Sequence, residues 1–312
     1  MEALVQVIPF DQFPEDELVL GHVLDAKAGA VEKHARVKHK MPIAKKGHLL
    51  DKCGGKQIRD AFIGMLKDKS KLDESQQQIE TLRPRFENEA MVVVLESIGD
   101  NVSPHRQVAL KLTTVDRDLL LIRHIIARDP FYSYEIPCGA SGVGNCVDPR
   151  TQEPTILKGR EDLRKILTIR RPSPDEVFLH DGRWATFGSN PGKKIDSLKA
   201  YFPTCEEEEK SKENGRADES YASEYYLFGQ TIADLNGKRM TEQDVRDIED
   251  ESTFYAINAL MNAEERQVGV DTRIRVGCFR CKKENHVDFF PVLTFLVGWG
   301  QTQEPTDQKP SS

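Results

Sequence analysis

The chain has 312 residues, of which 38% are hydrophobic and 30% are charged. Its 51 acidic and 44 basic residues leave a net charge of −7, which argues against a protein that covers nucleic acid with its whole surface. No apolar run approaches the roughly 18 residues of a membrane helix, and the acidic start Met1–Leu18 lacks the positive n-region of a secretory signal. These features predict a cytoplasmic protein of two domains, or of one domain with long appendages.

Residues 1–50 contain few apolar side chains and predict an extended N-terminal arm. The segment begins acidic and becomes basic between Lys33 and Lys46. A charge run of this kind is most often a solvated surface. The alternative is an arm that becomes ordered on a larger neighbour, which would supply the buried surface that the arm lacks.

Residues 51–130 predict a helical region. Apolar residues recur at helical spacing between Ile58 and Leu66, Pro84 is expected to interrupt or end a helix, and a further helix is predicted from Asn88 to Ile98. The clearest helix is predicted over 114–127, which is apolar on most sides and therefore central. The capping-box pattern Thr113-x-x-Asp116 opens it, so Asp116 is expected to act in capping and not in catalysis.

The rest of the chain predicts short strands around an acidic segment. Strands are expected at Phe131–Ile136 and Val177–His180, with a tight turn at Asp181-Gly182. Residues 203–240 include the run Glu206–Glu209 and predict an acidic linker or loop. Residues 241–266 predict one helix opened by Thr241-x-x-Asp244. The remaining residues are divided into a β-rich segment at 267–300 and a disordered tail at 301–312.

Four of the six cysteines form two pairs that predict a metal site. Cys278-Phe279-Arg280-Cys281 has the spacing with which a tight turn presents two sulfurs to one ion. Cys138 and Cys146 are separated by seven residues, three of which are glycine. Together the pairs would complete a structural four-cysteine site for zinc, with an iron–sulfur cluster as the less favoured cofactor. The alternatives are free buried cysteines, a disulfide in one pair, or mixed ligation with His286 or His124; Cys53 and Cys205 are expected to be free thiols.

These elements predict an α+β fold. A helical region would pack on a small β-rich module, stapled by the four-cysteine site and preceded by the extended arm. The two halves of this metal module would be residues 131–202 and 267–300.

Catalytic motifs are missing from the sequence. Gly139-x-Ser141-Gly142 is not a nucleophile elbow, because the fifth position is Val143. The stretch from Gly139 to Gly144 has the spacing of a phosphate-binding loop, but Asn145 stands where the lysine should be. We therefore expect no enzymatic activity.

Two segments resemble the baseplate proteins of contractile-tailed phages. The first is Thr114-Val115-Asp116-Arg117-Asp118-Leu119-Leu120-Leu121 with the aromatic strand that leads to Cys138 and Cys146. The second is Val270-Asp271-Thr272-Arg273-Ile274-x-Val276-x-Cys278-x-x-Cys281, closed by Phe289-Phe290. The pattern is similar to the base plate family of T-even phages and their Mu-like relatives, over residues 88–146 and 241–295.

The resemblance implies a non-enzymatic hub or tail-assembly protein with Cys138, Cys146, Cys278 and Cys281 as metal ligands. Its partners would be other baseplate, hub or tail-tube subunits in an oligomeric particle, with no membrane partner. The protein would be located in the virion, at the tail baseplate, and in the host cytoplasm during assembly. The alternative is a zinc-containing nucleic-acid-binding protein that uses Arg280, Lys282 and Lys283 together with the basic arm. The net charge of −7 makes nucleic acid the less favoured partner.

Overall fold

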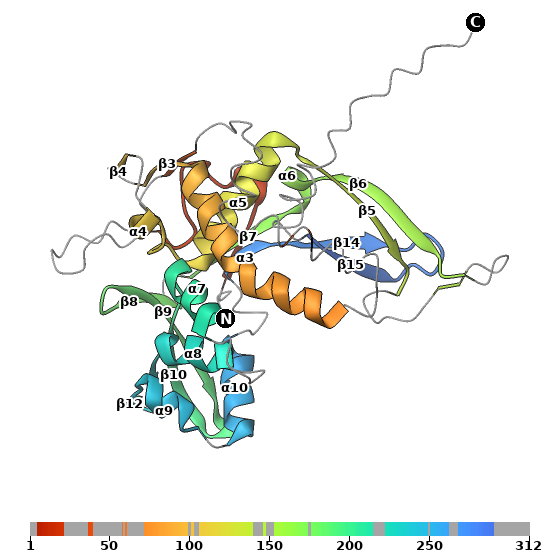
Figure 1. Cartoon of the computed structure of the whole chain (residues 1–312). Coiled ribbons are helices and arrows are strands. Elements are labelled where there is room, and N and C mark those ends of the chain that lie inside the picture. Colours follow the sequence, from red (N-terminus) through yellow and green to blue (C-terminus); the bar gives the residue numbers. More distant parts are fainter. Residues whose placement is uncertain are drawn as a thin grey trace, which may run out of the picture.

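The computed structural model of the chain describes residues 5–21, 37–39, 58, 60, 72–98, 101–102, 106–139, 146–147, 153–173, 176–214, 222–248, 250–261 and 268–289. Figure 1 shows an upper lobe, a lower lobe and a long β ribbon that extends from the upper lobe. The lower lobe comprises residues 176–201 and 222–261, and the upper lobe comprises the other described residues. The fold mixes helices and sheets and is α+β, as the sequence predicts.

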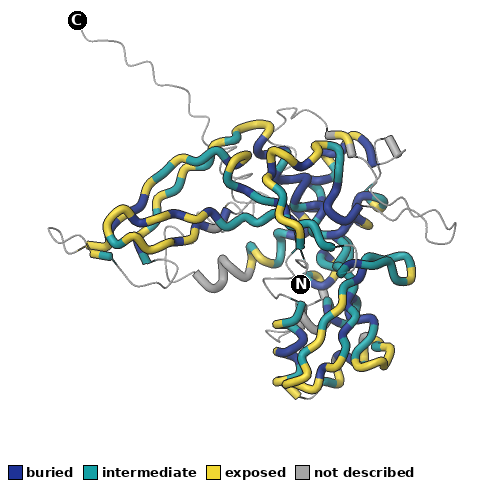
Figure 2. Tube along the Cα trace, turned by 180° about the vertical axis from the view of Figure 1, so that it is seen from behind, coloured by how far each residue is buried: buried dark blue, intermediate teal, exposed yellow. Residues whose placement is uncertain are grey.

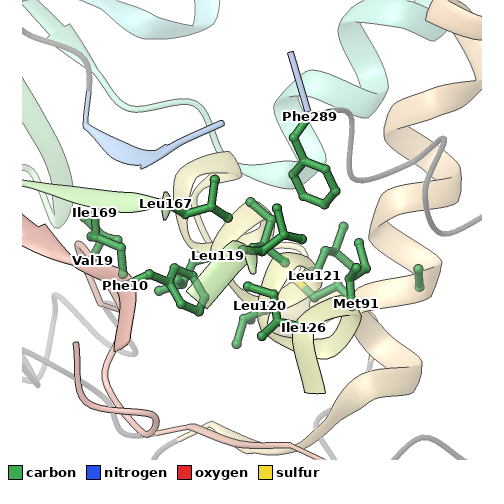
Figure 3. Packing of buried hydrophobic residues seen from close by; sticks show 14 of the residues in the cluster. Phe10, Val19, Met91, Leu119, Leu120, Leu121, Ile126, Leu167, Ile169 and Phe289 are labelled. Atoms are coloured by element: carbon green, nitrogen blue, oxygen red, sulfur yellow. The ribbon is translucent and has the colours of Figure 1, made fainter. Parts of the chain in front are cut away.

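The upper lobe contains a three-stranded sheet in which β7 lies between β1 and β13. Helix α5 contacts β13 of this sheet, and α3 packs against α5. Its core surrounds α5, and residues from the helices, the sheet and both ends of the described chain meet there (Figure 3). The buried residues of Figure 2 are concentrated in this region. The helices and strands are β1 (Val5–Pro9), β2 (Val37–His39), α3 (Leu72–Val94), β3 (Leu95–Ile98), β4 (Asn101–Val102), α4 (Arg106–Ala109), α5 (Thr114–Arg128), α6 (Leu163–Ile166), β7 (Thr168–Pro172), α7 (Cys205–Asn214) and β13 (Gly269–Asp271).

Helix α5 confirms the clearest prediction from the sequence, with its end one residue beyond the expected one. The Thr113 hydroxyl accepts a hydrogen bond from the Asp116 N–H, as a cap should. The Asp116 carboxylate does not complete a capping box. It accepts a hydrogen bond from the Leu20 N–H at 3.0 Å instead. This carboxylate therefore attaches a distant segment of the chain to the start of the helix.

Helix α3 corrects the predicted effect of Pro84. The proline lies inside the helix, and the expected helix from Asn88 to Ile98 ends at Val94, where strand β3 begins. A proline inside a helix costs about 3 kcal/mol, but Phe86 and Met91 on either side of the next turn are almost fully buried. Burial of two large side chains offsets a cost of this size. Most of the helix predicted after Ile58 lies outside the described residues.

The beginning of the chain is not an extended arm. Strand β1 pairs in antiparallel register with β7 along all five of its residues, and Leu18, Val19 and Leu20 are buried in the core. The sequence did not reveal this because β7, the strand that receives the segment, is more than 150 residues away. Of the basic stretch from Lys33 to Lys46, only β2 lies within the described residues, and it pairs with β3.

The acidic linker predicted at 203–240 is also wrong. Cys205–Asn214 form helix α7, in which Cys205, Glu209 and Ser211 are buried. Glutamates 208 and 209 bind arginines of the upper lobe, so the acidic run is a docking surface and not a solvated loop. The later part of the predicted linker contains helix α8 and strand β11 of the lower lobe.

The lower lobe has its own core and corrects the predicted domain division. An antiparallel sheet of order β12-β11-β10-β9-β8 packs against helices whose apolar residues form a separate cluster. Strands assigned by sequence to the metal module therefore belong to another unit. The elements are β8 (Val177–His180), β9 (Arg183–Asn190), β10 (Ile195–Tyr201), α8 (Ala222–Thr231), β11 (Ile232–Leu235), β12 (Lys238–Arg239), α9 (Glu242–Arg246) and α10 (Glu251–Met261).

Two local predictions in the lower lobe can be compared directly. The turn at Asp181-Gly182 is confirmed, since both residues have positive φ, 48° and 77°, as a two-residue hairpin turn requires. Thr241 and Asp244 form a complete capping box. The single helix expected at 241–266 is two helices, because Asp250 caps a new one through hydrogen bonds to Ser252 and Thr253.

Candidate metal centre

Two antiparallel strand pairs form the ribbon that carries the cysteines (Figure 1). Strands β5 (Phe131–Pro137) and β6 (Ile156–Asp162) pair along seven residues, and β14 (Arg273–Gly277) pairs with β15 (Glu284–Asp288) along five. Cys138 directly follows β5, and Cys278 and Cys281 lie in the turn between β14 and β15. The Tyr132 ring meets the Phe289 ring edge to face, with centroids 5.2 Å apart, and so joins the two strand pairs at their base.

The four predicted cysteines come together at the end of this ribbon. The sulfur atoms of Cys138, Cys146, Cys278 and Cys281 all lie within 4.8 Å of one another, and the Cys138 and Cys281 sulfurs are 3.6 Å apart. Cys138 and Cys278 are buried, whereas the other two are partly accessible. The predicted set of metal-binding residues is therefore confirmed as a spatial cluster.

The turn at Cys278 has the backbone arrangement that a thiolate ligand needs. Its N–H donates to the Lys283 carbonyl and its carbonyl accepts from the Lys282 N–H, both at 2.9 Å. Lys282 adopts φ 61°, which closes the turn. Backbone N–H groups of Cys281 and Arg280 point at the Cys278 sulfur and lower its pKa to about 6. This thiol is therefore ionised at neutral pH, before any metal ion binds.

Thr155 holds together Cys138 and Cys146, the two widely spaced cysteines of the first pair. Its carbonyl accepts from the Cys138 N–H and its N–H donates to the Cys146 carbonyl, both at 2.7 Å. Its hydroxyl oxygen lies 3.6 Å from the Cys146 sulfur, to which it donates. A single residue at the start of β6 thus holds both cysteines, although residues 140–145 between them lie outside the described part of the chain.

Asn285 connects the two halves of the centre. Its side-chain oxygen accepts a hydrogen bond of 2.7 Å from the Gly139 N–H, and its amide nitrogen lies 3.8 Å from the Cys138 sulfur. The residue is fully buried. Sequence reasoning missed both Thr155 and Asn285, because neither lies beside a cysteine and only the folded ribbon reveals their contacts.

In contrast to the thiol of Cys278, the thiol of Cys138 has a raised pKa. Removal from water raises the pKa of this thiol to about 11, so its deprotonation requires a nearby positive charge. A metal ion supplies such a charge when it binds. Four sulfur donors suit a tetrahedral ion of soft or borderline character and leave no ligand position for substrate or water. The donor set therefore fits a structural metal site.

The alternative ligands do not belong to the cluster. His124 is buried in α5, and His286 on β15 is 41% exposed at its side chain and faces Glu284; neither supplies an atom to the four-sulfur group. Cys205 is buried at the start of α7, where its thiol contacts the Thr113 carbonyl at 3.7 Å. Cys53 lies outside the described residues. No two of the described cysteines form a disulfide.

Comparisons with protein-family models, with curated proteins and with solved structures produce no match to this chain. Among the helices that the structure describes, none has the length and apolar character required to cross a bilayer.

Proposed function

We propose that the protein is a non-enzymatic structural or assembly component of the baseplate hub of a contractile-tailed phage, stabilised by zinc. The metal centre carries the structural part of this proposal. Four thiolates close the coordination sphere, so the bound ion can cross-link the ribbon but cannot activate water or substrate. Zinc is the ion that a closed Cys₄ set most commonly holds.

The phage assignment is supported by the residues that resemble the baseplate family. The quoted motifs of the resemblance lie in the upper lobe, where the aromatic strand β5 and Phe289 make contact, whereas residues 241–261 of its wider extent belong to the lower lobe. Within the first segment, Asp116 and Arg117 are buried and bound to other parts of the chain. These two charged residues of the motif therefore have structural partners within the chain.

Mass spectrometry of purified tail particles from the phage that encodes the chain tests the assignment. We expect the protein in tails or in tail-assembly intermediates at a fixed stoichiometry. Cys278→Ser should abolish incorporation, because it removes a ligand of the metal centre, while Cys205→Ser should not. Absence of the protein from tails and from all assembly intermediates would refute the baseplate proposal.

Elemental analysis of the purified protein tests the metal separately. We expect about one zinc per chain, lost in Cys278→Ser and retained in Cys205→Ser. A preparation that contains neither zinc nor iron, with all four thiols reactive in the folded protein, would contradict the metal site. This result is independent of the tail experiment, so the two parts of the proposal can fail separately.

One observation favours nucleic acid as a second candidate partner. Phe279, between the paired cysteines, is 63% exposed, and the Arg280 guanidinium lies 5.8 Å from its ring centroid. However, a Zn²⁺ ion with four thiolates has a formal charge of −2, which nearby Arg280, Lys282 and Lys283 would balance. A gel-shift salt series with wild type and Phe279→Ala distinguishes the two roles of these residues.

A further inference from the structure

Among the described residues, the helices of the lower lobe pack on one face of its five-stranded sheet. Leu198 and Ile232 point to that face, where they pack with Phe228, Phe254 and Ile257 of helices α8 and α10. In antiparallel pairs, residues directly opposite each other lie on the same side of the sheet. The register therefore identifies the residues of the other side.

Aromatic and basic residues occupy this other side. Phe178 on β8 is opposite Ala185 on β9, which is opposite Tyr201 on β10, and His180 is opposite Arg183. Phe187 is opposite Lys199 on β10. Lys199 is opposite Asp234 on β11, and Asp234 is in turn opposite Arg239 on β12. We call this surface the open face and define it by Phe178, His180, Arg183, Phe187, Lys199, Tyr201 and Arg239.

The rings of the open face form two stacked pairs. Phe178 and Phe187 are nearly parallel, with centroids 4.2 Å apart, and His180 is nearly parallel to Tyr201 at 5.9 Å. Phe187 is 42% exposed, so part of its ring is open to contact by a ligand. A single exposed apolar side chain is common on protein surfaces, but Phe187 belongs to a group of four neighbouring rings.

A cation accompanies each ring pair. The Arg183 guanidinium lies 4.2 Å from the Tyr201 ring centroid and is also ion-paired with Glu207 of α7 at 2.7 Å. The Lys199 ammonium lies 5.9 Å from the Phe187 ring centroid. Beside the His180–Tyr201 pair, a hollow of about 420 Å³ is lined by residues that include Lys199 and Arg239 and the acidic residues Asp181 and Asp234. Its volume can accommodate part of a flexible chain.

We propose that the open face binds single-stranded nucleic acid. Bases would stack on the exposed side of Phe187 and beside His180, and phosphates would lie near Lys199 and Arg239. An antiparallel sheet with helices behind it and aromatic side chains on its free face is suited to unpaired bases, because every base offers a π-face. Aromatic residues and arginine are also enriched in protein–protein interfaces, but lysine is depleted there, so the position of Lys199 beside the Phe187 ring is the feature that favours nucleic acid over a protein partner.

This proposal does not depend on the tail assignment or on the metal. The open face belongs to the lower lobe, while the metal centre lies at the end of the ribbon of the upper lobe (Figure 1). The presence of Asp181 and Asp234 predicts modest affinity and a strong dependence on salt. Phe279 and Arg280, between Cys278 and Cys281, form a separate candidate surface. Variants of these two residues therefore serve as internal controls.

Fluorescence anisotropy with the full-length protein and a labelled thymidine oligonucleotide tests the proposal. An oligonucleotide of about 20 nucleotides exceeds the site size of comparable single-strand binders. We expect binding at about 50 mM salt that weakens steeply towards 200 mM, and weaker binding to the matching duplex. Phe187→Ala should weaken binding about tenfold, and Phe187→Trp should restore it, because stacking requires a ring. Lys199→Gln should reduce the salt slope by about 0.7.

Phe131→Ala is the matched control. Phe131 is also a strand phenylalanine, 44% exposed, with the Arg160 guanidinium 4.5 Å from its ring centroid. We expect its replacement to leave binding unchanged, and Phe187→Ala to leave the melting temperature and metal content unchanged. The proposal is overturned if the oligonucleotide does not bind at low salt, if the duplex binds more tightly, or if Phe279→Ala removes binding while Phe187→Ala does not. Loss of a protein partner with Phe187→Ala, without oligonucleotide binding, would likewise overturn it and assign the face to protein.

Discussion

At the scale of single residues, a buried side-chain amide joins two cysteine pairs that are far apart in the sequence. Asn285 bonds Gly139 across 146 residues and also contacts the Cys138 sulfur. Hydrogen bonds to a ligand sulfur orient it and stabilise its charge. Asn285 therefore fixes the position of the first cysteine pair relative to the second.

Asn285→Ala should weaken metal binding about 10- to 100-fold, as losses of such supporting contacts do. The measurement is the rate and midpoint of metal transfer to a chromogenic chelator. Asn236→Ala is the control, because Asn236 makes a similar set of bonds to Asp196 N–H, Ser197 N–H and the Lys194 carbonyl in the lower lobe. Equal metal release from both variants would remove the assigned role of Asn285.

A second buried residue, Asp116, makes stability depend on pH. Burial raises the pKa of its carboxyl from 3.8 to about 6, against the hydrogen bonds from Leu20 and Thr113. Because the folded pKa lies above the unfolded one, this group contributes stability that is present below pH 3.8 and lost as pH rises through 6. The loss amounts to at most about 3 kcal/mol, at 1.36 kcal/mol for each pKa unit.

Asp116→Asn should therefore be at least as stable as wild type at pH 7, because the amide keeps an acceptor for the Leu20 N–H and carries no charge. The difference between the two proteins should shrink towards pH 4. Asp116→Ala should be less stable by about 1–3 kcal/mol at both pH values, since it leaves that N–H unsatisfied. Urea unfolding at the two pH values measures these changes. An asparagine variant much less stable at pH 7 than at pH 4, relative to wild type, would show that the sign is wrong.

At the scale of elements, α7 is attached to the upper lobe by a buried charge cluster. Arg117 is 2% exposed, and its guanidinium lies 2.5 Å from Glu208 of α7 and 2.7 Å from Glu87 of α3. Burial raises the pKa of Glu87 to about 8. Arg117 overcomes the burial of Glu208 and lowers the pKa of that carboxyl. Arg117 therefore favours the ionised form of Glu208, while burial favours the protonated form of Glu87.

The two glutamates should respond differently to the same substitution. Glu208→Gln should destabilise the protein by about 1.5–3 kcal/mol at pH 7, because it removes the carboxylate closest to the buried Arg117 guanidinium and leaves Asp118, at 2.9 Å, as its remaining charged partner. Glu87→Gln should be at least as stable as wild type there. Because the folded pKa of Glu87 lies above the unfolded value of 4.5, wild type should lose stability as pH rises from 4.5 to about 8, and the Glu87→Gln variant should not. Urea unfolding across this pH range measures both effects, and equal costs of the two substitutions at pH 7 would contradict this assignment.

At the scale of the whole molecule, the two lobes have separate cores, and only the upper one includes the cysteines. Metal removal should therefore affect them unequally. The binding free energy of a structural site is largely folding free energy, about 10–16 kcal/mol in small metal modules. Its loss should loosen the ribbon, whose strands otherwise rely on their pairing and on a few buried apolar residues, among them Leu157, Ile274 and Val287.

Chelation of the metal should abolish amide-exchange protection in β5, β6, β14 and β15 and lower the melting temperature of the upper lobe. Protection in β9 and β10 should remain. Hydrogen-exchange mass spectrometry with and without chelator, together with the Cys278→Ser and Cys205→Ser variants, makes the comparison. Uniform loss of protection in both lobes would indicate one cooperative unit and refute their independence.

The sequence alone determined the features that depend on neighbours a few residues away. The Thr113 cap, the apolar helix that follows, the Asp181-Gly182 turn and the paired cysteines all follow from local geometry or side-chain chemistry. The tertiary structure decided whatever needs a distant partner. It placed Val5–Pro9 in a sheet and buried Leu18–Leu20 in the core, kept Pro84 inside α3, and turned the acidic run into a docked helix. It also bonded Asp116 to Leu20 across 96 residues. Contacts of that range leave no periodic signal in the chain, because burial and hydrogen bonding between distant segments exist only after folding.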